Sequence, residues 1–198
     1  MTQHAVCVFC GSQPGFRAEY VATAREMARL LAQSGIELVY GGGHVGLMGA
    51  LADAALAHGG RVVGVIPEHL MRPEVAHQAL TELIVVDSMH TRKQTMARRS
   101  DAFIVLPGGF GTLEEMFEMV TWLQLRLQDK PVALLNVAGY FDSLLQFLEH
   151  AANEGLIRRE HQGLLLVEHV PAQLLARLAA YWAQAPAALR ADSDTSLG

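Results

Sequence analysis

Short apolar runs alternate along the chain with longer stretches in which apolar residues recur about every 3.6 positions. Residues 103–106 and 132–135 are apolar throughout and do not alternate with polar residues. Uninterrupted runs of this kind are typical of strands that are covered on both faces, as in a parallel sheet. They predict seven strands, over residues 5–10, 36–40, 61–66, 82–87, 102–106, 131–136 and 164–168.

The stretches between these runs have the periodicity of helices that bury one face. The clearest apolar stripe is formed by Tyr20, Ala24, Met27, Leu30 and Leu31. Helices are predicted over residues 17–33, 46–58, 90–99, 112–128, 141–153 and 171–183. Repeated strand–helix units predict an α/β fold with a Rossmann-like, doubly wound and mainly parallel seven-stranded sheet flanked by helices. We expect residues 1–185 to form a single domain and residues 186–198 to be a flexible tail.

Composition narrows the possible partners. Of the 198 residues, 51% are hydrophobic and 18% charged, with a formal net charge of −5 and a pI of about 6.0. That balance does not favour a nucleic-acid partner or an acidic membrane surface. No signal peptide opens the sequence, and no apolar run reaches the roughly 18 residues that span a bilayer. We therefore expect a cytoplasmic protein with no membrane partner.

Cys7 and Cys10 have the C-x-x-C spacing of some redox and zinc sites. Such sites usually lie at turns or helix starts, whereas this pair lies within a predicted strand. Residues three apart on a strand point to opposite faces. We therefore expect two separate buried thiols.

Three strand-to-helix turns are rich in glycine: a first loop (10–15), a second loop (41–49) and a third loop (107–111). Ligands of doubly wound sheets bind beyond the carboxyl ends of the strands. All three loops should therefore lie along one edge of the sheet.

The second loop contains G-x-G-x-x-G at Gly41, Gly43 and Gly46, the spacing of a dinucleotide-binding turn. That turn usually follows the first strand, and an acidic residue ends the next one. Here the loop follows the second strand, although Glu68 does come just after the third. Binding of NAD(P), a role in turn formation and packing, and the lining of another nucleotide site all remain open.

The third loop has three glycines in four residues and leads into a helix, which is the arrangement of a phosphate site. No lysine precedes Thr112, so it is not a Walker A loop, and ATP hydrolysis is disfavoured. Thr112 and Glu115 also fit a helix capping box. However, Glu114, Glu115 and Glu118 place unusual negative charge beside a phosphate site.

A cation pair, Arg92 and Lys93, opens the helix that precedes the third loop. Cations at a helix start oppose the helix dipole, so a role in anion binding explains them better than a solvated helix start does. Both would lie at a neighbouring carboxyl end of the sheet.

At these residues the sequence resembles the LOG family of cytokinin-activating phosphoribohydrolases, often mislabelled lysine decarboxylases. The resemblance is carried by residues 107–115 and 89–93, by 8–12 with Tyr20, and by 41–49, and it covers the chain to about residue 150. Gln13 stands where serine is common. The resemblance implies hydrolysis of the N-glycosidic bond of AMP or an N6-prenylated relative, by a homodimer. From the lysines and histidines of the chain, we expect no cofactor and no metal.

The resemblance also assigns residues. Arg92 and Glu115 match the catalytic pair of the family. The positions that match or lie within its nucleotide-binding motifs are Glu74, Lys93, Gly109, Phe110, Gly111, Thr112, Leu113, Glu114, Thr121, Gly11, Ser12 and Gly43. Cleavage of a ribosyl bond develops positive charge at the anomeric carbon, which Glu115 would stabilise while it orients water. Arg92 would engage the phosphate or the ribose.

Other classes of function remain open. A pyridoxal phosphate decarboxylase needs a Schiff-base lysine, and the only lysines are Lys93 and Lys130. The nine histidines show no metal-binding motif. A non-catalytic nucleotide or cofactor carrier and an NAD(P)-dependent oxidoreductase are the alternatives. The predicted helix around 113–127 is apolar almost all round, so part of it could cover a dimer interface.

Overall fold

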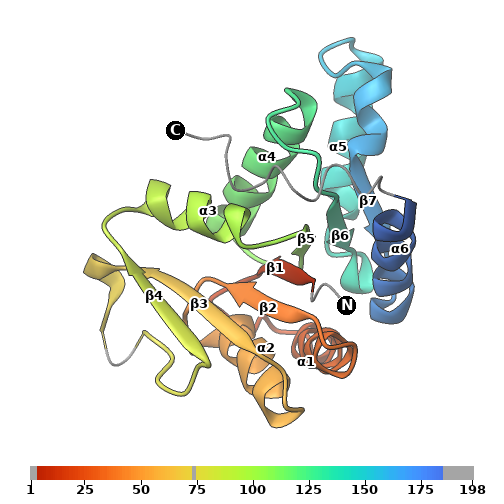
Figure 1. Cartoon of the computed structure of the whole chain (residues 1–198). Helices are drawn as coiled ribbons and strands as arrows, with labels where there is room; N and C mark the ends of the chain where they lie inside the picture. Colours follow the sequence, from red (N-terminus) through yellow and green to blue (C-terminus); the bar gives the residue numbers. More distant parts are fainter. Residues whose placement is uncertain (1–3, 73–74, 185–198) are drawn as a thin grey trace.

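A computed structural model describes residues 4–72 and 75–184 and shows one sheet of seven strands (Figure 1). The strands are β1 (Ala5–Phe9), β2 (Glu37–Tyr40), β3 (Val62–Pro67), β4 (Glu82–Val86), β5 (Ala102–Val105), β6 (Val132–Leu135) and β7 (Leu165–Glu168). Their order across the sheet is β4-β3-β2-β1-β5-β6-β7, and every neighbouring pair is parallel. Each strand lies within two residues of its predicted bounds, and the predicted α/β class is confirmed.

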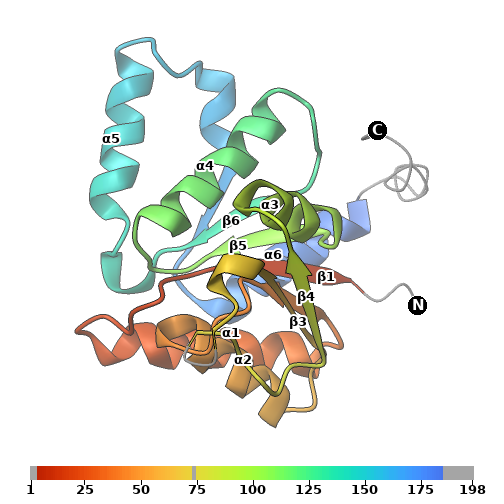
Figure 2. The same cartoon turned by 90° about the vertical axis from the view of Figure 1, so that its left-hand side faces the viewer.

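Within the described part of the chain, six helices cover the sheet: α1 (Ala18–Gln33), α2 (Gly46–Ala57), α3 (Met89–Arg98), α4 (Phe110–Gln124), α5 (Asp142–Asn153) and α6 (Pro171–Gln184). Helices α1, α2 and α6 pack on one face, and α3, α4 and α5 on the other (Figures 1 and 2). The sheet is therefore doubly wound. Residues 4–72 and 75–184 also contain three short 3-10 turns, at Glu68–Leu70, Val137–Gly139 and Arg159–Leu164.

Strand β1 and the residue directly after it, Cys10, contribute alternately to both cores. Cys7 packs among the side chains under α3 and α4, whereas Cys10 packs with those under α1 and α2. Both thiols are free and buried. The expectation of two separate buried cysteines is confirmed, and its reason is the alternation of side chains along a strand.

The strand order places a switch point between β1 and β5. The chain builds outward from β1 to β4, then returns to the other side of β1 and builds outward again to β7. Loops that follow the two central strands then diverge to opposite faces, which opens the crevice where ligands bind in such sheets. The first and third glycine loops follow β1 and β5, respectively.

Helix α4 starts earlier than the sequence predicts. Its N-cap is Gly109 in an extended conformation, and Phe110 is the first helical residue. Thr112 is therefore the third residue of the helix and not its cap, so the capping-box interpretation of Thr112 and Glu115 is wrong. The glycines let the chain turn into the helix two residues before the first residue with a capping hydroxyl.

Helix α4 also ends earlier, at Gln124, whereas the sequence predicts a helix to residue 128. Arg126 adopts a φ of 59°, in the left-handed region. Its N–H bonds to Leu123 O (3.1 Å), and Leu127 N–H bonds to Trp122 O (2.9 Å). This is the Schellman pattern of helix termination, which usually has glycine where Arg126 stands.

Some sequence predictions concern residues outside those described. Glu74 and the tail 186–198 belong to this group. No helix in 4–72 or 75–184 is long and apolar enough to cross a membrane. The cytoplasmic location stays a prediction.

Candidate active site

The three glycine loops meet at the carboxyl edge of the sheet, as predicted. Gly11 N–H donates to Pro107 O (3.0 Å), and Gly11 O accepts from Leu47 N–H (3.1 Å), so the first loop is bonded to both of the others. A Cβ atom at Gly108 would lie 2.9 Å from Gly11 N, and one at Gly46 would overlap the backbone of Ser12. Glycine is therefore needed at 46 and 108 because backbones approach each other closely there.

The third loop presents backbone donors to solvent. At the start of α4, Leu113 N–H bonds to Gly109 O (3.1 Å), so the amides of Phe110, Gly111 and Thr112 come before any intrahelical acceptor. Gly109, Phe110 and Gly111 are exposed, and Cβ atoms at the two glycines would meet nothing within 4 Å. Open glycines at a helix N-terminus are suited to an anion.

Arg92 and Glu115 form an ion pair beside this loop. Nη1 of Arg92 donates to Oε1 of Glu115 at 3.2 Å, and the side chains are only 11% and 10% exposed. The same guanidinium donates from Nε to Val65 O (3.0 Å) and from Nη2 to Gly41 O (3.1 Å). Arg92 thus joins the carboxyl ends of β2 and β3 to helix α4.

Burial raises the pKa of Glu115 from its ordinary value of 4.5 to about 7. Arg92 and Lys93 lower that pKa, while the negative charges of Glu114 and Glu118 raise it. Removal from water disfavours the charged carboxylate more than its single contact with Arg92 favours it. The group is therefore poised to exchange a proton near neutral pH, as acid–base catalysts are.

Lys93 is also paired and not free in solvent. Its Nζ contacts Oε1 of Glu114 and Oε2 of Glu118, the latter at 3.0 Å, and its side chain is 13% exposed. Burial lowers the pKa of Lys93, but the hydrogen bonds to the two carboxylates outweigh it, and the pKa is raised. The acidic cluster that the sequence shows beside the third loop is thus matched by Arg92 and Lys93.

The solvated helix start considered for these cations is wrong, whereas their role in anion binding stays a prediction. Both side chains extend from α3 to α4 and engage its carboxylates. An anion that binds here meets two cations already held by acidic partners.

The second loop is held by the segment that follows Glu74. Gly43 pairs with Ala76 in an antiparallel bridge, His44 N–H donates to Val75 O (2.9 Å), and His77 N–H donates to Gly42 O (2.9 Å). His77 is buried, and its Nδ1 accepts from Ala79 N–H (3.2 Å), which leaves Nε2 to donate to Asp53 (3.0 Å). Gly43 itself is buried under Met48.

The predicted substrate contacts do not all gather at one place. Ser12 is exposed beside Gly46, while Leu113 packs its side chain against the core and bonds its N–H within the helix. Thr121 is exposed on α4, six residues and about 9 Å along the axis from Glu115. The substrate-binding roles of these three residues, like those of the other residues assigned from the resemblance, stay predictions.

Sequence reasoning missed two features of the site. Tyr140 donates its hydroxyl to Gly108 O (2.6 Å) and packs edge-on against Tyr20, with ring centroids 5.5 Å apart. It lies just beyond the carboxyl end of β6, so the rule that led to the glycine loops applies to it as well. The second feature is the anchoring of Arg92 on backbone carbonyls, which has no signal in the sequence.

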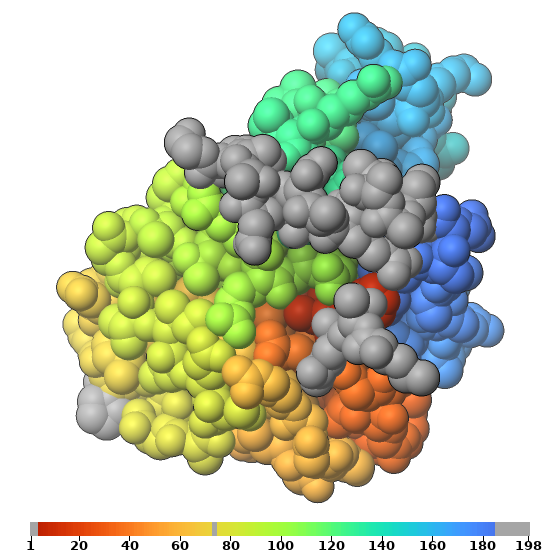
Figure 3. All heavy atoms as spheres, in the orientation of Figure 1, coloured from red at the N-terminus to blue at the C-terminus, as the bar shows by residue number. Residues whose placement is uncertain are grey.

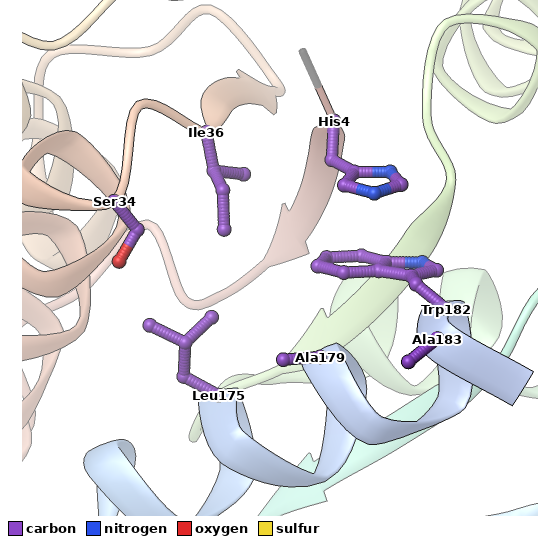
Figure 4. A pocket seen from close by; sticks show the side chains of 7 residues that line it. All are labelled: His4, Ser34, Ile36, Leu175, Ala179, Trp182 and Ala183. Carbon is purple, nitrogen blue, oxygen red and sulfur yellow. The ribbon is translucent and has the colours of Figure 1, made fainter. Parts of the chain in front are cut away.

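A hollow of about 400 Å³ lies at the opposite, amino edge of the sheet, between the start of β1 and α6 (Figure 4). His4 and Trp182 stack there with ring centroids 4.1 Å apart, and Ile36 and Leu175 line the same space. It is remote from the loops and mainly apolar. Across 4–72 and 75–184, no three His, Cys, Asp or Glu side chains cluster as metal ligands would.

Comparison with known proteins gives consistent matches. A protein-family model described as "possible lysine decarboxylase" matches residues 48–178. A probable cytokinin riboside 5′-monophosphate phosphoribohydrolase of Oryza sativa subsp. japonica is 49% identical over 176 residues, which cover 89% of this chain and 72% of that protein. A cytokinin riboside 5′-monophosphate phosphoribohydrolase of Rhodococcoides fascians is 55% identical over 157 residues, 79% of each chain.

Among solved structures, the Moco carrier protein of Chlamydomonas reinhardtii resembles this chain with a TM-score of 0.70. The match covers 92% of this chain and 99% of that one, at 22% sequence identity. At that identity the likeness concerns the fold alone.

Proposed function

The chain belongs to the LOG family of cytokinin riboside 5′-monophosphate phosphoribohydrolases, and from this membership we propose that it hydrolyses the N-glycosidic bond of such nucleotides, of AMP, or of both. The products are the free base and ribose 5-phosphate. The observation that carries the proposal is Glu115, a buried carboxylate with a pKa of about 7 beside an open, glycine-rich helix start.

Glu115 supplies the chemistry in this proposal. Water attacks the anomeric carbon as the bond to the base nitrogen breaks, and the bonding electrons leave with the base, which takes up a proton. The ionised carboxylate stabilises the positive charge on the ribose and accepts the proton of the attacking water. A pKa near 7 suits that proton transfer, because the ionised form is populated at neutral pH and still binds a proton readily.

The third loop binds the 5′-phosphate. The amides of Phe110, Gly111 and Thr112 supply hydrogen-bond donors, and the helix dipole favours the negative charge. A phosphate bound at the third loop holds the ribose in place beside Glu115, which lowers the entropic cost of reaching the transition state.

Arg92 acts mainly on Glu115. The sequence suggests that Arg92 engages phosphate or ribose, but each of its three nitrogens already donates one hydrogen bond within the protein. Nη1 also donates to Sδ of Met89 at 4.0 Å. A guanidinium has five N–H donors, so one remains for a substrate oxygen. The main effect of Arg92 is to orient the carboxylate and keep it ionised.

A decarboxylase, the activity in the name of the matching family model, does not fit the two lysines. Lys93 is paired with Glu114 and Glu118. Lys130 lies before β6, at the amino edge of the sheet, and donates to Ala97 O (2.8 Å). Neither is placed as a Schiff-base lysine beside the glycine loops.

The test is base release by the purified protein and by Glu115→Gln. AMP and isopentenyladenosine 5′-monophosphate are incubated with each, and free base is measured by chromatography. We expect the parent to release base and Glu115→Gln to be slower by about 10²–10³, the cost of one electrostatic element. Calorimetry should still detect nucleotide binding, because the phosphate loop is unchanged.

Glu149→Gln, an exposed change on α5, is the matched control and should keep the parental rate. Absence of base from both nucleotides would favour the carrier alternative. Turnover that depends on a nicotinamide nucleotide would favour the oxidoreductase. A parental rate of base release by Glu115→Gln would overturn the role of Glu115.

We further propose that the protein is a homodimer built on helix α4. Phe117 and Leu125 are 39% and 58% exposed, and with Thr121 between them they form one stripe at four-residue spacing. Leu127, 60% exposed, extends the stripe beyond the helix. A second copy that covers this stripe would also bury Thr121. We therefore expect Thr121, which is far along α4 from Glu115, to lie at the interface between the two subunits.

A further inference from the structure

The backbone at Gly41 is in direct contact with the guanidinium of Arg92. Gly41 O accepts a hydrogen bond from Nη2 at 3.1 Å. A Cβ atom at position 41 would overlap that same nitrogen, and the Sδ atom of Met48 would lie 3.4 Å away from it. The space that a side chain would fill is therefore the space that the guanidinium occupies.

This requirement differs from that of the other glycines of the second loop. Gly42 and Gly46 have φ values of 74° and 62°, so a side chain at either is strained whatever surrounds it. Gly41 is not among the residues with positive φ. Alanine therefore fits the backbone at 41, and its severe clash is with the far end of one flexible side chain.

The observed position of Arg92 is held from several sides. Its hydrogen bonds to Val65 O, Gly41 O and Glu115 hold the guanidinium between β2, β3 and α4. A fourth, longer one joins Nη1 to Sδ of Met89 at 4.0 Å. The side chain is 11% exposed, so its position is fixed by packing as well as by bonds. If Nη2 is displaced, the geometry of Nη1 toward Glu115 changes with it, because the guanidinium is planar and rigid.

We propose that Gly41 is a positioning residue for the reaction: it leaves the space, and supplies the carbonyl, that hold Arg92 against Glu115. The expected loss of activity rests on the proposed function, whereas the expected displacement of Arg92 does not. The methyl group of Gly41→Ala displaces Arg92 from Glu115, although neither Arg92 nor Glu115 is itself substituted. Glu115 then stays buried with its principal cation displaced.

The kinetic test is a double-mutant cycle of Gly41→Ala, Arg92→Ala and the double variant. We expect Gly41→Ala alone to lower kcat by about 10²-fold, the cost of one electrostatic element. In the Arg92→Ala background the same change should lower kcat less than twofold, since the group that it displaces is already absent. Equal losses in both backgrounds would mean that Gly41 acts through its own loop, which overturns the inference.

Gly163→Ala is the matched control. Its Cβ would meet nothing within 4 Å, and its φ is not positive, so parental activity is expected. If Gly41→Ala fails to fold while the double variant folds, the loss of folding is due to the clash with Arg92, and the inference is supported. If neither folds, the backbone and not Arg92 requires glycine, and the inference is wrong.

A second readout does not depend on any activity. Arg92 lowers the pKa of Glu115, so carbon-13 NMR of the glutamate carboxyl groups should show a higher pKa for Glu115 in Gly41→Ala and in Arg92→Ala. The double variant should show no further rise. If the pKa of Glu115 is unchanged in Gly41→Ala, the inference is wrong, even if the enzyme is active. If the pKa rises as expected but the protein releases no base, the inference about Gly41 stands and the proposed function fails.

Discussion

Glu115 carries two opposing influences whose balance decides its chemistry. Burial raises its pKa, and the contact with Arg92 lowers it. The net result, about 7, means that folding favours the protonated carboxyl. At neutral pH the ionised form of such a buried carboxyl lowers the free energy of unfolding, and strongly shifted pKa values of this kind are common at functional sites.

The pH dependence of stability follows from the sign of this shift. The folded pKa of about 7 lies above the ordinary 4.5, so between these values the folded state binds more protons than the unfolded state. The contribution of Glu115 to the free energy of unfolding is therefore fully present below about pH 4.5 and is lost as the pH rises through 7. The loss is on the order of 3 kcal/mol.

Urea unfolding of the parent and Glu115→Gln at pH 5, 6, 7 and 8 measures this effect. The stability of the variant relative to the parent should rise with pH and level off above about pH 7. Glu26→Gln is the control: its hydrogen bond with Arg29 lowers the pKa of Glu26, so that carboxylate is ionised in both states across this range and the difference should stay flat. A flat difference for Glu115→Gln would contradict the raised pKa.

At the scale of elements, helix α4 shows which boundaries a sequence can encode. Its apolar periodicity predicts a helix correctly, but both of its ends are set by backbone conformations. Gly109 caps the start without a side chain, and Arg126 ends the helix at a φ of 59°. The start of the helix needs no capping hydroxyl. Its end lies at an arginine, a residue type that does not indicate helix termination in a sequence.

Arg126→Gly should stabilise the protein, because glycine adopts the left-handed conformation without the steric cost that a Cβ atom brings. That cost is about 1 kcal/mol, and the greater freedom of glycine in the unfolded chain offsets part of it. We expect a gain of about 0.5 kcal/mol in the free energy of unfolding, measured by urea titration. Arg25→Gly, an exposed change within α1, should have the opposite sign and cost about 1 kcal/mol, and a loss of stability in Arg126→Gly would contradict the assignment.

At the scale of the whole molecule, the order of the strands selects the site. The two central strands, β1 and β5, are neighbours although they are about a hundred residues apart, and their loops touch through Gly11 and Pro107. Figure 3 shows that residues of α3 and of the end of α4 reach the surface on the same side of the molecule. The exposed residues Phe117, Leu125 and Leu127 make α4 the surface that we propose a second copy covers.

The dimer prediction is tested by analytical ultracentrifugation. The parent should sediment at twice the 21.5 kDa of one chain, and Phe117→Glu should shift it toward the single-chain mass, because a buried unpaired charge is costly. Val170→Glu changes an exposed apolar residue just before α6 and should leave the dimer intact. A parental protein at the mass of one chain would contradict the proposal.

The sequence by itself determined the elements and their type. Apolar runs predicted seven strands within two residues of their bounds, and the helical periodicity of α1 is matched by its buried Ala24, Met27 and Leu31. It also placed the three glycine loops at one edge, because parallel strands bring their carboxyl ends together. These features are local, and each short segment carries its own burial pattern.

Only the tertiary structure decided how the charged residues are used. Arg92 lies 23 residues from Glu115 and 51 from Gly41 in the sequence, yet it bonds to both. No periodicity encodes such contacts, since they depend on the order of strands and on the space that Gly41 leaves. The pKa of Glu115 has the same origin: burial and neighbouring charge are properties of the packed molecule, and the sequence alone supplies only the carboxylate.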